Sequence, residues 1–274
     1  MNNELKTVKP CNPIAPYLGG KRGLAKTITP LLDKIPHKLY AEPFVGMGGV
    51  FFRRTSKPKA EVINDISYDI SNLFRIIERF PVYFQHMLEF KVCSRLEFQR
   101  LLETPASLLT DFERAVRFLY LQKNAFGGKS VGQSFGVATE RPARFNALKV
   151  VDEIEKLHHR LSDVVIENLP YQELIRRYDR EYALFYLDPP YWGCENDYGK
   201  NIFERADFEN LAKLLGEIKG KFVMSINDVP EIREIFKKFH IMDVTTTYSI
   251  CTNNLKQGKE AKELLISNVD LKGL

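Results

Sequence analysis

The run Tyr182–Leu187 restricts the fold of this chain most strongly, because all of its residues are apolar or aromatic. A short, wholly apolar run between polar neighbours is typical of a strand covered on both faces, as in a parallel sheet between two layers of helices. The run ends at Asp188-Pro189-Pro190-Tyr191. Ligands of such sheets bind beyond the carboxyl ends of the strands. The pattern therefore predicts a layered α/β fold with a ligand site beginning at residue 188.

A strand, turn, helix and strand near the N-terminus support the same fold class. Helical spacing of apolar residues predicts a helix over 23–33, and the two strands are expected at 38–42 and 60–64, with a helix starting at 50–54. Between them lies the glycine-rich turn Gly46-Met47-Gly48-Gly49. Its G-x-G-G spacing matches neither the dinucleotide fingerprint nor a Walker motif. The turn predicts either close approach of a ligand to the backbone or a tight connection without a ligand.

Asp65 follows the second of these strands directly. In nucleotide-binding α/β sheets an acid at this place accepts hydrogen bonds from the two hydroxyl groups of a ribose. The alternative is an exposed Asp that caps the next helix. The strand context favours ribose binding, so the sequence predicts a nucleoside-containing ligand near the glycine turn.

The middle of the chain interrupts this strand and helix rhythm. Helices are predicted over 67–80, 81–90, 94–103, 111–121 and 147–161, with Asn146 as an N-cap and a loop over 122–146 that has room for a hairpin. Strands follow at 163–167, 182–187, 221–226, 240–246 and 263–267, with helices at 207–219 and 230–239. We therefore expect a doubly wound mixed sheet formed by residues 1–66 and 163–274, with a mainly helical domain, 67–162, inserted into it.

Positive charge is concentrated in the inserted segment. The whole chain has a net charge of +5, yet residues 114–149 contain seven basic residues and a single acid, Glu140. Such a concentration is typical of a surface that binds a polyanion such as nucleic acid. The alternative is a solvated basic face without a partner.

Metal, disulfide and membrane sites have little support in the sequence. The four cysteines, Cys11, Cys93, Cys194 and Cys251, are far apart and form no CxxC pair, so we expect reduced, mostly buried thiols and no metal. No apolar run approaches the roughly 20 residues of a membrane span, and the first residues lack the apolar stretch of a secretory signal. We therefore expect a cytoplasmic protein that does not contact a membrane.

The tetrapeptide that starts at Asp188 suits an amino group as its ligand. Proline has no backbone N–H, so Pro189 and Pro190 contribute only carbonyl acceptors, and the Asp188 carboxylate adds further acceptors. Tyr191 offers a flat face on which a base can stack. The alternative is a rigid loop without a ligand.

Three motifs in a fixed order, Tyr17-Leu-Gly-Gly-Lys21, Pro43-Phe-Val-Gly-Met-Gly-Gly49 and Asp188-Pro-Pro-Tyr191, resemble the Dam-like adenine-N6 DNA methyltransferases, the D12 class or α group. The resemblance runs from about Pro13 to Asn268. It implies a class I methyltransferase-like fold, S-adenosylmethionine as methyl donor with S-adenosylhomocysteine as product, and double-stranded DNA as substrate. RNA guanine-N2 and glutamine methyltransferases share the tetrapeptide, but there it follows the glycine motif closely.

The resemblance also implies roles for individual residues. Catalysis is expected from Asp188, Pro189, Pro190 and Tyr191, and cofactor binding from Tyr17, Lys21, Phe44, Gly46, Gly48, Asp65 and Asp188. DNA contacts are expected from Arg114, Lys123, Asn124, Phe126, Lys129, Arg141 and Arg144. The Asp188 carboxylate and the Pro189 carbonyl would accept the hydrogens of N6 of an adenine that has flipped out of the duplex and stacked on Tyr191. No covalent intermediate is required.

The loop that follows Lys123 departs from the pattern of the GATC-specific members, since it has Phe126-Gly-Gly-Lys129 and Phe135-Gly-Val-Ala138. The sequence therefore leaves open a site-specific enzyme, with or without a partner restriction nuclease, and an enzyme of relaxed specificity, as in prophage-encoded relatives. Two further alternatives remain at this point: a cytosine-N4 or RNA amino-methyltransferase, and a catalytically silent DNA-binding protein. We expect a monomer encoded by a bacterium or a phage.

Overall fold

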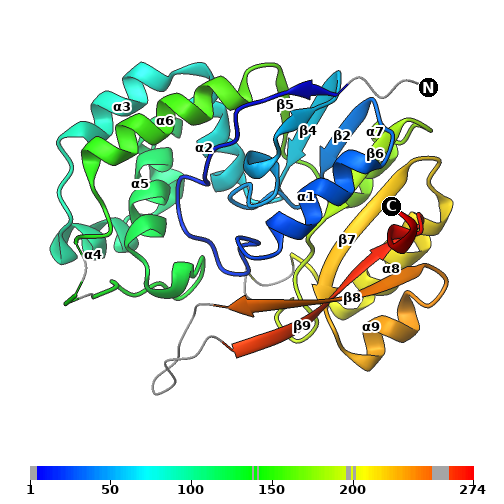
Figure 1. Cartoon of the computed structure of the whole chain (residues 1–274). Helices are drawn as coiled ribbons and strands as arrows, with labels where there is room; N and C mark the ends of the chain where they lie inside the picture. Colours follow the sequence, from blue (N-terminus) through cyan, green and yellow to red (C-terminus); the bar gives the residue numbers. More distant parts are fainter. Residues whose placement is uncertain (1–4, 138, 141, 196–198, 200–201, 249–258) are drawn as a thin grey trace.

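The structure, a computed structural model, describes residues 5–137, 139–140, 142–195, 199, 202–248 and 259–274. Its centre is a seven-stranded sheet in the order β5-β4-β2-β6-β7-β9-β8 (Figure 1). The strands are β2 (Leu39–Glu42), β4 (Ala60–Asn64), β5 (Val164–Glu167), β6 (Ala183–Leu187), β7 (Lys221–Asn227), β8 (His240–Tyr248) and β9 (Lys259–Ser267). Strands β5, β4, β2, β6 and β7 run parallel to one another, and β9 is antiparallel to both β7 and β8.

The strand order reverses between β2 and β6. From β2 the chain moves outward to β4 and β5, and then crosses back to β6 on the other side of β2. Ligands of open α/β sheets bind at such a switch point, outside the carboxyl ends of the strands. The sheet confirms the predicted doubly wound, mixed, class I methyltransferase-like fold, and it directs the search for a site to the ends of β2 and β6.

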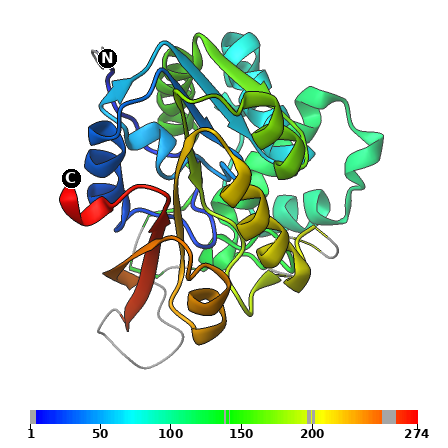
Figure 2. The same cartoon turned by 90° about the vertical axis from the view of Figure 1, so that its right-hand side faces the viewer.

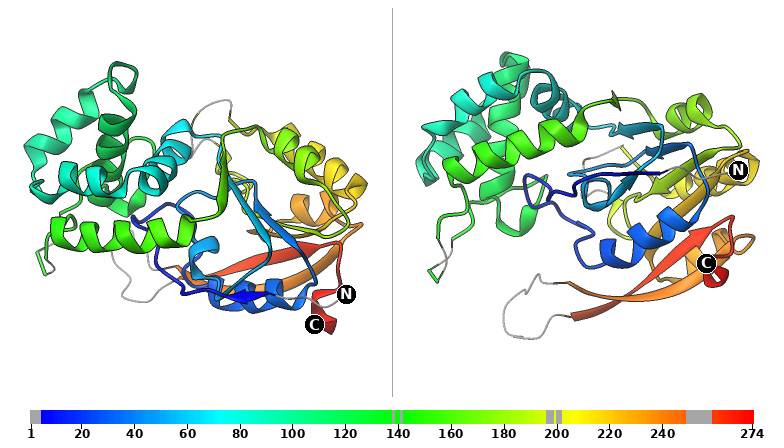
Figure 3. Two further views of the ribbon diagram at one scale, coloured as in Figure 1. Left: turned by 90° about the horizontal axis from the view of Figure 1, so that it is seen from above. Right: turned by 45° about the horizontal axis from the view of Figure 1, so that its top comes forward.

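Helices cover both faces of the sheet (Figures 2 and 3). On one face, residues such as Tyr40 and Tyr186 pack in a core shared with α1 (Ala25–Lys34). On the other face, Ala41 and Phe185 pack with α7 (Tyr171–Tyr178), α8 (Arg205–Glu217) and α9 (Pro230–Ile235). Because strand residues alternate between faces, neighbours in the sequence enter opposite cores. All of Ala183–Leu187 is buried, which confirms the predicted central strand.

The predicted helical insertion lies between β4 and β5. It contains α2 (Tyr68–Arg79), α3 (Pro81–Glu89), α4 (Arg95–Glu103), α5 (Asp111–Asn124) and α6 (Ala147–Leu161), which gather at the left of Figure 1. The Asn146 side chain accepts a hydrogen bond from Lys149 N, as predicted for the N-cap of α6. Helices α2 and α6 belong to the same core cluster as the sheet, so packing is continuous across residues 67 and 162. The division of the chain into two domains stays a prediction.

A buried ionic cluster ties α6 to β4. Arg160 donates to both carboxylate oxygens of Glu61, at 2.6 and 2.9 Å, and its guanidinium lies 3.9 Å from the ring centre of Phe51. Arg54 lies 3.6 Å from the same carboxylate. Removing one partner of such a buried pair leaves an uncompensated charge, which costs about 3–5 kcal/mol. The cluster therefore fixes the end of the insertion on the sheet.

Several local predictions need correction. Helix α7 and a two-stranded sheet of β1 (Lys6–Thr7) and β3 (Ser56–Lys57) were not expected. The helix predicted at 50–54 is a 3₁₀ turn, Phe51–Arg53, and three more 3₁₀ turns span Ala106–Leu108, Phe126–Gly128 and Leu271–Gly273. Helix α9 ends at Ile235, because the chain turns back there to begin β8.

The prediction that the cysteines are mostly buried is wrong for the described ones. Cys11 and Cys93 are half-buried and Cys194 is exposed, while Cys251 lies outside the described residues. Among the residues that the structure describes, no group of His, Cys, Asp and Glu side chains has the arrangement of a metal site. No helix in this part of the chain is long and apolar enough to span a membrane.

Candidate active site

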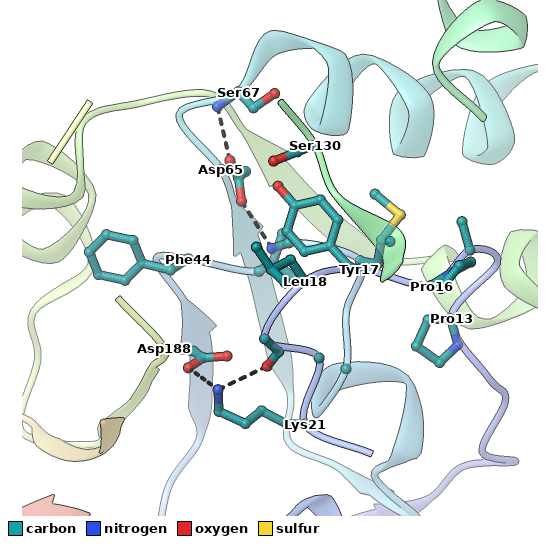
Figure 4. A pocket seen from close by; sticks show the side chains of 18 of the residues that line it. Pro13, Pro16, Tyr17, Leu18, Lys21, Phe44, Asp65, Ser67, Ser130 and Asp188 are labelled. Carbon is teal, nitrogen blue, oxygen red and sulfur yellow. Dashed lines mark hydrogen bonds and ion pairs between the residues drawn. The ribbon is translucent and has the colours of Figure 1, made fainter. Parts of the chain in front are cut away.

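A cavity of about 1660 Å³ lies at the carboxyl edge of the sheet, between the N-terminal loop, the strand ends and the loop after α5 (Figure 4). All three sequence motifs contribute to its lining. The predicted site residues that line it are Tyr17, Lys21, Phe44, Gly46, Asp65, Asp188, Pro190, Lys123, Phe126 and Arg144. Small-molecule pockets commonly measure about 300–1,000 Å³. This cavity is therefore larger than one cofactor requires.

Asp65 is fixed at one end of the cavity by the backbone. Gly46 N donates to its Oδ2 and Ser67 N to its Oδ1, both at 2.9 Å. Burial raises the pKa of Asp65 to about 6, although these two N–H groups oppose the rise. The carboxylate is therefore mostly ionised at neutral pH, and each oxygen retains a lone pair for a hydroxyl group. The geometry suits the predicted ribose acceptor.

The two glycines predicted to bind the cofactor have different environments. Gly46 has φ +50° and lines the cavity, and a Cβ atom there would lie 3.2 Å from the Tyr17 ring. Gly48 does not line the cavity; with φ +71°, its missing Cβ would lie 2.3 Å from the Phe52 ring. Gly48 is thus required for the packing of the turn, which corrects its predicted place at the cofactor.

An ion pair occupies the other end of the cavity. Lys21 Nζ lies 2.7 Å from Asp188 Oδ1 and donates to Gly19 O at 3.0 Å. The Lys21 side chain is only 2% exposed, whereas that of Asp188 is 22% exposed and lines the cavity. Burial raises the pKa of Asp188, and the Lys21 ammonium group opposes this rise most strongly. The arrangement places a buried cation against this carboxylate and leaves the carboxylate facing the cavity.

Strand β7 contacts both the first residue of the tetrapeptide and the residue that follows it. Ser225 Oγ donates to Asp188 Oδ1 at 3.3 Å, and it lies 2.7 Å from the Tyr186 hydroxyl. Two residues further along the strand, Asn227 accepts from Trp192 N at 3.0 Å and donates to Trp192 O at 3.1 Å. Residues two apart on a strand share a face, so one face of β7 fixes the whole loop. The sequence reading did not identify Ser225.

The other members of the tetrapeptide are less accessible than predicted. Pro189 is buried, and neither Pro189 nor Tyr191 belongs to the cavity lining found among the described residues. The Lys21 ammonium lies 4.5 Å from the centre of the Tyr191 ring, and Glu263 of β9 forms a hydrogen bond with Tyr191. Stacking of a base on Tyr191, as predicted, therefore requires Lys21 to move or the opposite ring face to be used.

An aromatic wall was also missed by the sequence reading. The Phe44 ring lies 5.3 Å from that of Tyr171 and 6.0 Å from that of Phe203, and all three side chains line the cavity. Tyr171 follows β5 in the segment Asn168-Leu-Pro-Tyr171. A polar residue, a proline and a tyrosine thus follow this strand as they follow β6, which is a signal that could have identified it. Such a wall suits a planar ring.

A hairpin over residues 124–136 forms the opposite side of the cavity. Its ladder is short, with Phe126 N donating to Ser134 O and Gly136 N to Asn124 O, both at 2.8 Å. The buried side chain of Gln122 donates to Pro16 O at 2.8 Å and to Gly128 O at 2.7 Å. Leu18 N also donates to Gly128 O, at 2.9 Å. The hairpin is thereby docked on the loop that carries Tyr17.

The predicted DNA contacts divide into four groups. Phe126, Lys129 and Arg144 are exposed on the hairpin side. Arg114 is paired with Asp69 at 2.5 Å and Lys123 with Glu153 at 2.6 Å, so the fold neutralises part of the charge counted along the sequence. Asn124 is corrected: its amide is fully buried, donates to Tyr120 O and accepts from Cys93 Sγ, so it does not reach DNA in this structure. Arg141 lies outside the described residues.

Comparison with known proteins identifies one family. A family model described as D12 class N6 adenine-specific DNA methyltransferase matches residues 17–250. The chain is 24% identical to the type II methyltransferase M.CviBI of Paramecium bursaria Chlorella virus NC1A over 264 residues, which cover 93% of this chain and 99% of the relative. It is 27% identical to the DNA adenine methylase of Haemophilus influenzae over 278 residues, or 92% of each chain. It is 23% identical to the type II methyltransferase M.MjaIII of Methanocaldococcus jannaschii, covering 93% of this chain and 99% of that one.

Proposed function

Since this chain belongs to the D12 class N6 adenine-specific DNA methyltransferases, we propose that its cavity holds S-adenosylmethionine at the Asp65 end and an adenine extruded from duplex DNA at the Asp188 end. The observation that carries this proposal is that both carboxylates line one cavity, which is larger than a single cofactor needs. The family description and the names of the relatives favour adenine in DNA over the cytosine-N4, RNA and catalytically silent alternatives.

The residues at the Asp65 end fit the cofactor. Asp65 accepts the ribose hydroxyls, and the positive φ of Gly46 leaves the space beside Tyr17 open. The aromatic wall of Phe44, Tyr171 and Phe203 offers a face to a planar ring. When bound, S-adenosylmethionine supplies a methyl group activated by a positively charged sulfur. The chain's task is to position an amine opposite that group.

At the Asp188 end, the task is to orient the N6 amino group. Its lone pair is delocalised into the adenine ring, so the free amine is a poor nucleophile. Asp188 accepts a hydrogen bond from N6, and this directs the lone pair toward the methyl group. The Pro189 carbonyl accepts a second one only if the loop moves, because Pro189 is not among the described residues that line the cavity. As the N–C bond forms, the bond between the methyl carbon and the donor sulfur breaks, and its electron pair stays on sulfur. Positive charge thereby passes from sulfur to nitrogen, where the carboxylate stabilises it. The nitrogen then loses one proton, which Asp188 accepts and passes to solvent.

DNA is held on the hairpin side of the cavity. Lys129 and Arg144 are exposed cations suited to phosphate contacts, and the exposed Phe126 ring is placed to fill the stack that the extruded base leaves. Extrusion costs a few kcal/mol, and these contacts offset it. Recognition of a particular sequence is left to this hairpin, because its loop differs from that of the GATC-specific pattern.

Transfer of a labelled methyl group tests this proposal. The protein is incubated with tritium-labelled S-adenosylmethionine and either unmethylated plasmid DNA or total RNA, and the nucleosides are then separated. We expect the label in N6-methyldeoxyadenosine. Label in N4-methyldeoxycytidine or in RNA nucleosides would overturn the proposal, as would calorimetry that detects no binding of the cofactor. Sequencing of the modified adenines in the same plasmid then separates a specific site from relaxed specificity.

A further inference from the structure

We propose that Ser225 is a positioning residue for methyl transfer, which acts by holding one oxygen of Asp188 so that the other faces the target amine. This inference rests on the proposed function of the cavity, because it assigns a role within that same site. Ser225 is fully buried on β7, next to β6, whose end carries Asp188. It contacts the carboxylate from the protein interior and has no contact with the cavity space itself.

The direction of the hydrogen bonds follows from the number of hydrogens available. An ionised carboxylate only accepts, so Ser225 must donate its single hydroxyl hydrogen to Asp188 Oδ1. The contact of 2.7 Å between Ser225 and Tyr186 must then be a donation from tyrosine to serine. Burial holds the pKa of Tyr186 well above its ordinary value, so this phenol keeps its hydrogen. The result is a one-way chain from Tyr186 through Ser225 to Asp188.

These hydrogen bonds distinguish the two oxygens of Asp188. Both Ser225 and Lys21 contact Oδ1, at 3.3 and 2.7 Å. Because the contacts found for this carboxylate in the described part of the chain fall on Oδ1, we assign Oδ2 as the oxygen presented to N6. Lys21 alone would fix a distance but not the plane of the carboxylate, because it approaches as a point charge on a flexible stem. Ser225 donates a hydrogen bond to the carboxylate from a second direction, and its position is fixed by strand β7.

The same contact affects the proton affinity of Asp188. A hydrogen bond to the charged form of an acid lowers its pKa. Ser225 therefore offsets part of the rise in the pKa of Asp188 that burial causes. Loss of this hydroxyl has two consequences: the carboxylate is less well oriented, and it becomes protonated at a higher pH.

The Ser225→Ala variant of the full-length protein tests this role. Single-turnover methylation of unmethylated plasmid DNA is measured from pH 5 to pH 9 with saturating cofactor. We expect the rate at pH 7 to fall roughly tenfold, as for loss of one hydrogen bond to a charged group. The acid limb of the profile should move up by about 0.5–1 pH unit, because one donor to the carboxylate is gone. The dissociation constant for S-adenosylmethionine should stay within twofold of wild type.

Two further variants separate positioning from a structural role. Asn227→Ala loosens the loop at Trp192 but leaves both donors on Asp188, so its rate should fall without a shift of the acid limb. The double variant Ser225→Ala/Tyr186→Phe removes the tyrosine hydroxyl that the single change would leave buried and unsatisfied. It should recover the melting temperature and keep the shifted limb.

The outcomes distinguish this inference from the proposed function. If the wild type transfers no methyl group to DNA, the proposed function is wrong. If the wild type is active and Ser225→Ala has the same rate and acid limb, Ser225 does not position Asp188. A Ser225→Ala variant whose acid limb returns to its wild-type position in the double variant would also overturn the inference, because the shift would then come from the unsatisfied tyrosine.

Discussion

The carboxyl edge of the sheet and the hairpin over 124–136 face each other across one cavity, and they are held in different ways. At the sheet edge, Lys21 is 2% exposed and paired with Asp188, and Asp65 accepts from two backbone N–H groups. On the hairpin, the Phe126 side chain is 46% exposed and the ladder is short. The difference separates two tasks. Orienting one amine requires a rigid, desolvated site, whereas binding a long polyanion requires exposed groups.

One buried amide joins these two regions. The Gln122 side chain donates to Pro16 O, in the loop that carries Tyr17, and to Gly128 O, in the hairpin. Gly128 has φ +68° and lies close to the backbone of Tyr17. A side chain at residue 128 would meet that backbone at 3.1 Å. The hairpin is therefore seated on the loop that carries Tyr17, so the exposed residues that we propose contact DNA are fixed relative to the proposed catalytic residues.

The largest expected effect comes from removing the acceptor at the sheet edge. Asp188→Ala should lower the rate of methyl transfer at least 100-fold, because both the orientation of N6 and the charge that stabilises the developing cation are lost. The rate is measured with labelled cofactor and plasmid DNA. Asp152→Ala, which removes an exposed acid of α6, is the matched control and should retain full activity.

The variant leaves the buried Lys21 ammonium group without its carboxylate partner, which destabilises the fold, so its melting temperature is measured beside its activity. Where it is folded, it should still bind DNA, because the hairpin is unchanged. An Asp188→Ala protein with more than a tenth of the wild-type rate would show that the sheet edge does not perform the chemistry, and the contrast between the two regions would be lost.

A second effect concerns the cofactor end and its pH dependence. The pKa of Asp65 is raised to about 6, so protonation below that pH removes the charged acceptor for the ribose hydroxyls. The dissociation constant for S-adenosylmethionine should rise as the pH falls from 7.5 to 5. Asp65→Asn should bind the cofactor roughly tenfold more weakly at pH 7.5, as expected for loss of hydrogen bonds to a charged group.

Calorimetry on both proteins checks this prediction. The Asn variant should also lose the pH dependence around 6. A wild-type affinity that is constant from pH 7.5 to pH 5 would contradict the assignment of Asp65 to the cofactor.

Smaller effects are expected from the exposed cations on the hairpin side of the cavity. Lys129→Ala and Arg144→Ala should each weaken DNA binding a few-fold and lower the slope of log affinity against log salt by about one, since each removes one phosphate contact. Lys123→Ala should change the slope less, because Lys123 is already paired with Glu153. Fluorescence anisotropy of a labelled duplex at several salt concentrations measures these slopes. Equal slopes for all three variants and the wild type would place the duplex elsewhere.

The smallest effect tests the desolvation of the sheet edge. Glu42, at the end of β2, is buried and accepts from Tyr40 at 2.7 Å, and burial raises its pKa from 4.5 to about 8. The folded protein therefore keeps a proton that the unfolded chain loses above pH 4.5, so wild-type stability falls as the pH rises from 4.5 to about 8 and levels off above that. Glu42→Gln has no proton to lose and should be more stable than wild type at pH 9, by at least about 1 kcal/mol. Urea unfolding of the wild type and of Glu42→Gln at pH 6 and pH 9 gives the comparison. If the difference in unfolding free energy between the two proteins is the same at both pH values, Glu42 is not protonated in the folded protein.

The sequence predicted the sheet edge better than the hairpin, and the reason is physical. Asp65 and Asp188 directly follow strands, and parallel strands bring their carboxyl ends together, so local patterns were sufficient to place both residues at one site. Ser225 lies mid-strand in an apolar segment, and its role depends on which strand is the neighbour of β6. Strand neighbours are set by the crossover of the whole chain, which local periodicity does not contain.

The hairpin shows the opposite limit. When charges are counted along the sequence, Arg114 and Lys123 are both available to DNA. In the structure they are paired with Asp69 and Glu153, which come from other helices. Asn124 was expected to contact DNA because the predicted loop over 122–146 includes it, yet α5 continues to residue 124 and buries it. Contacts between helices of the insertion decided these cases, so the sequence predicted the kind of surface but not its members.

The most direct test of the two-ended cavity is a crystal structure of the protein bound to its substrate duplex and S-adenosylhomocysteine. The account predicts an adenine outside the helix, with N6 within hydrogen-bonding distance of Asp188 and the ribose of the cofactor on Asp65. A complex in which the adenine stays stacked in the duplex, or in which its N6 lies away from Asp188 with the cofactor bound, would contradict it.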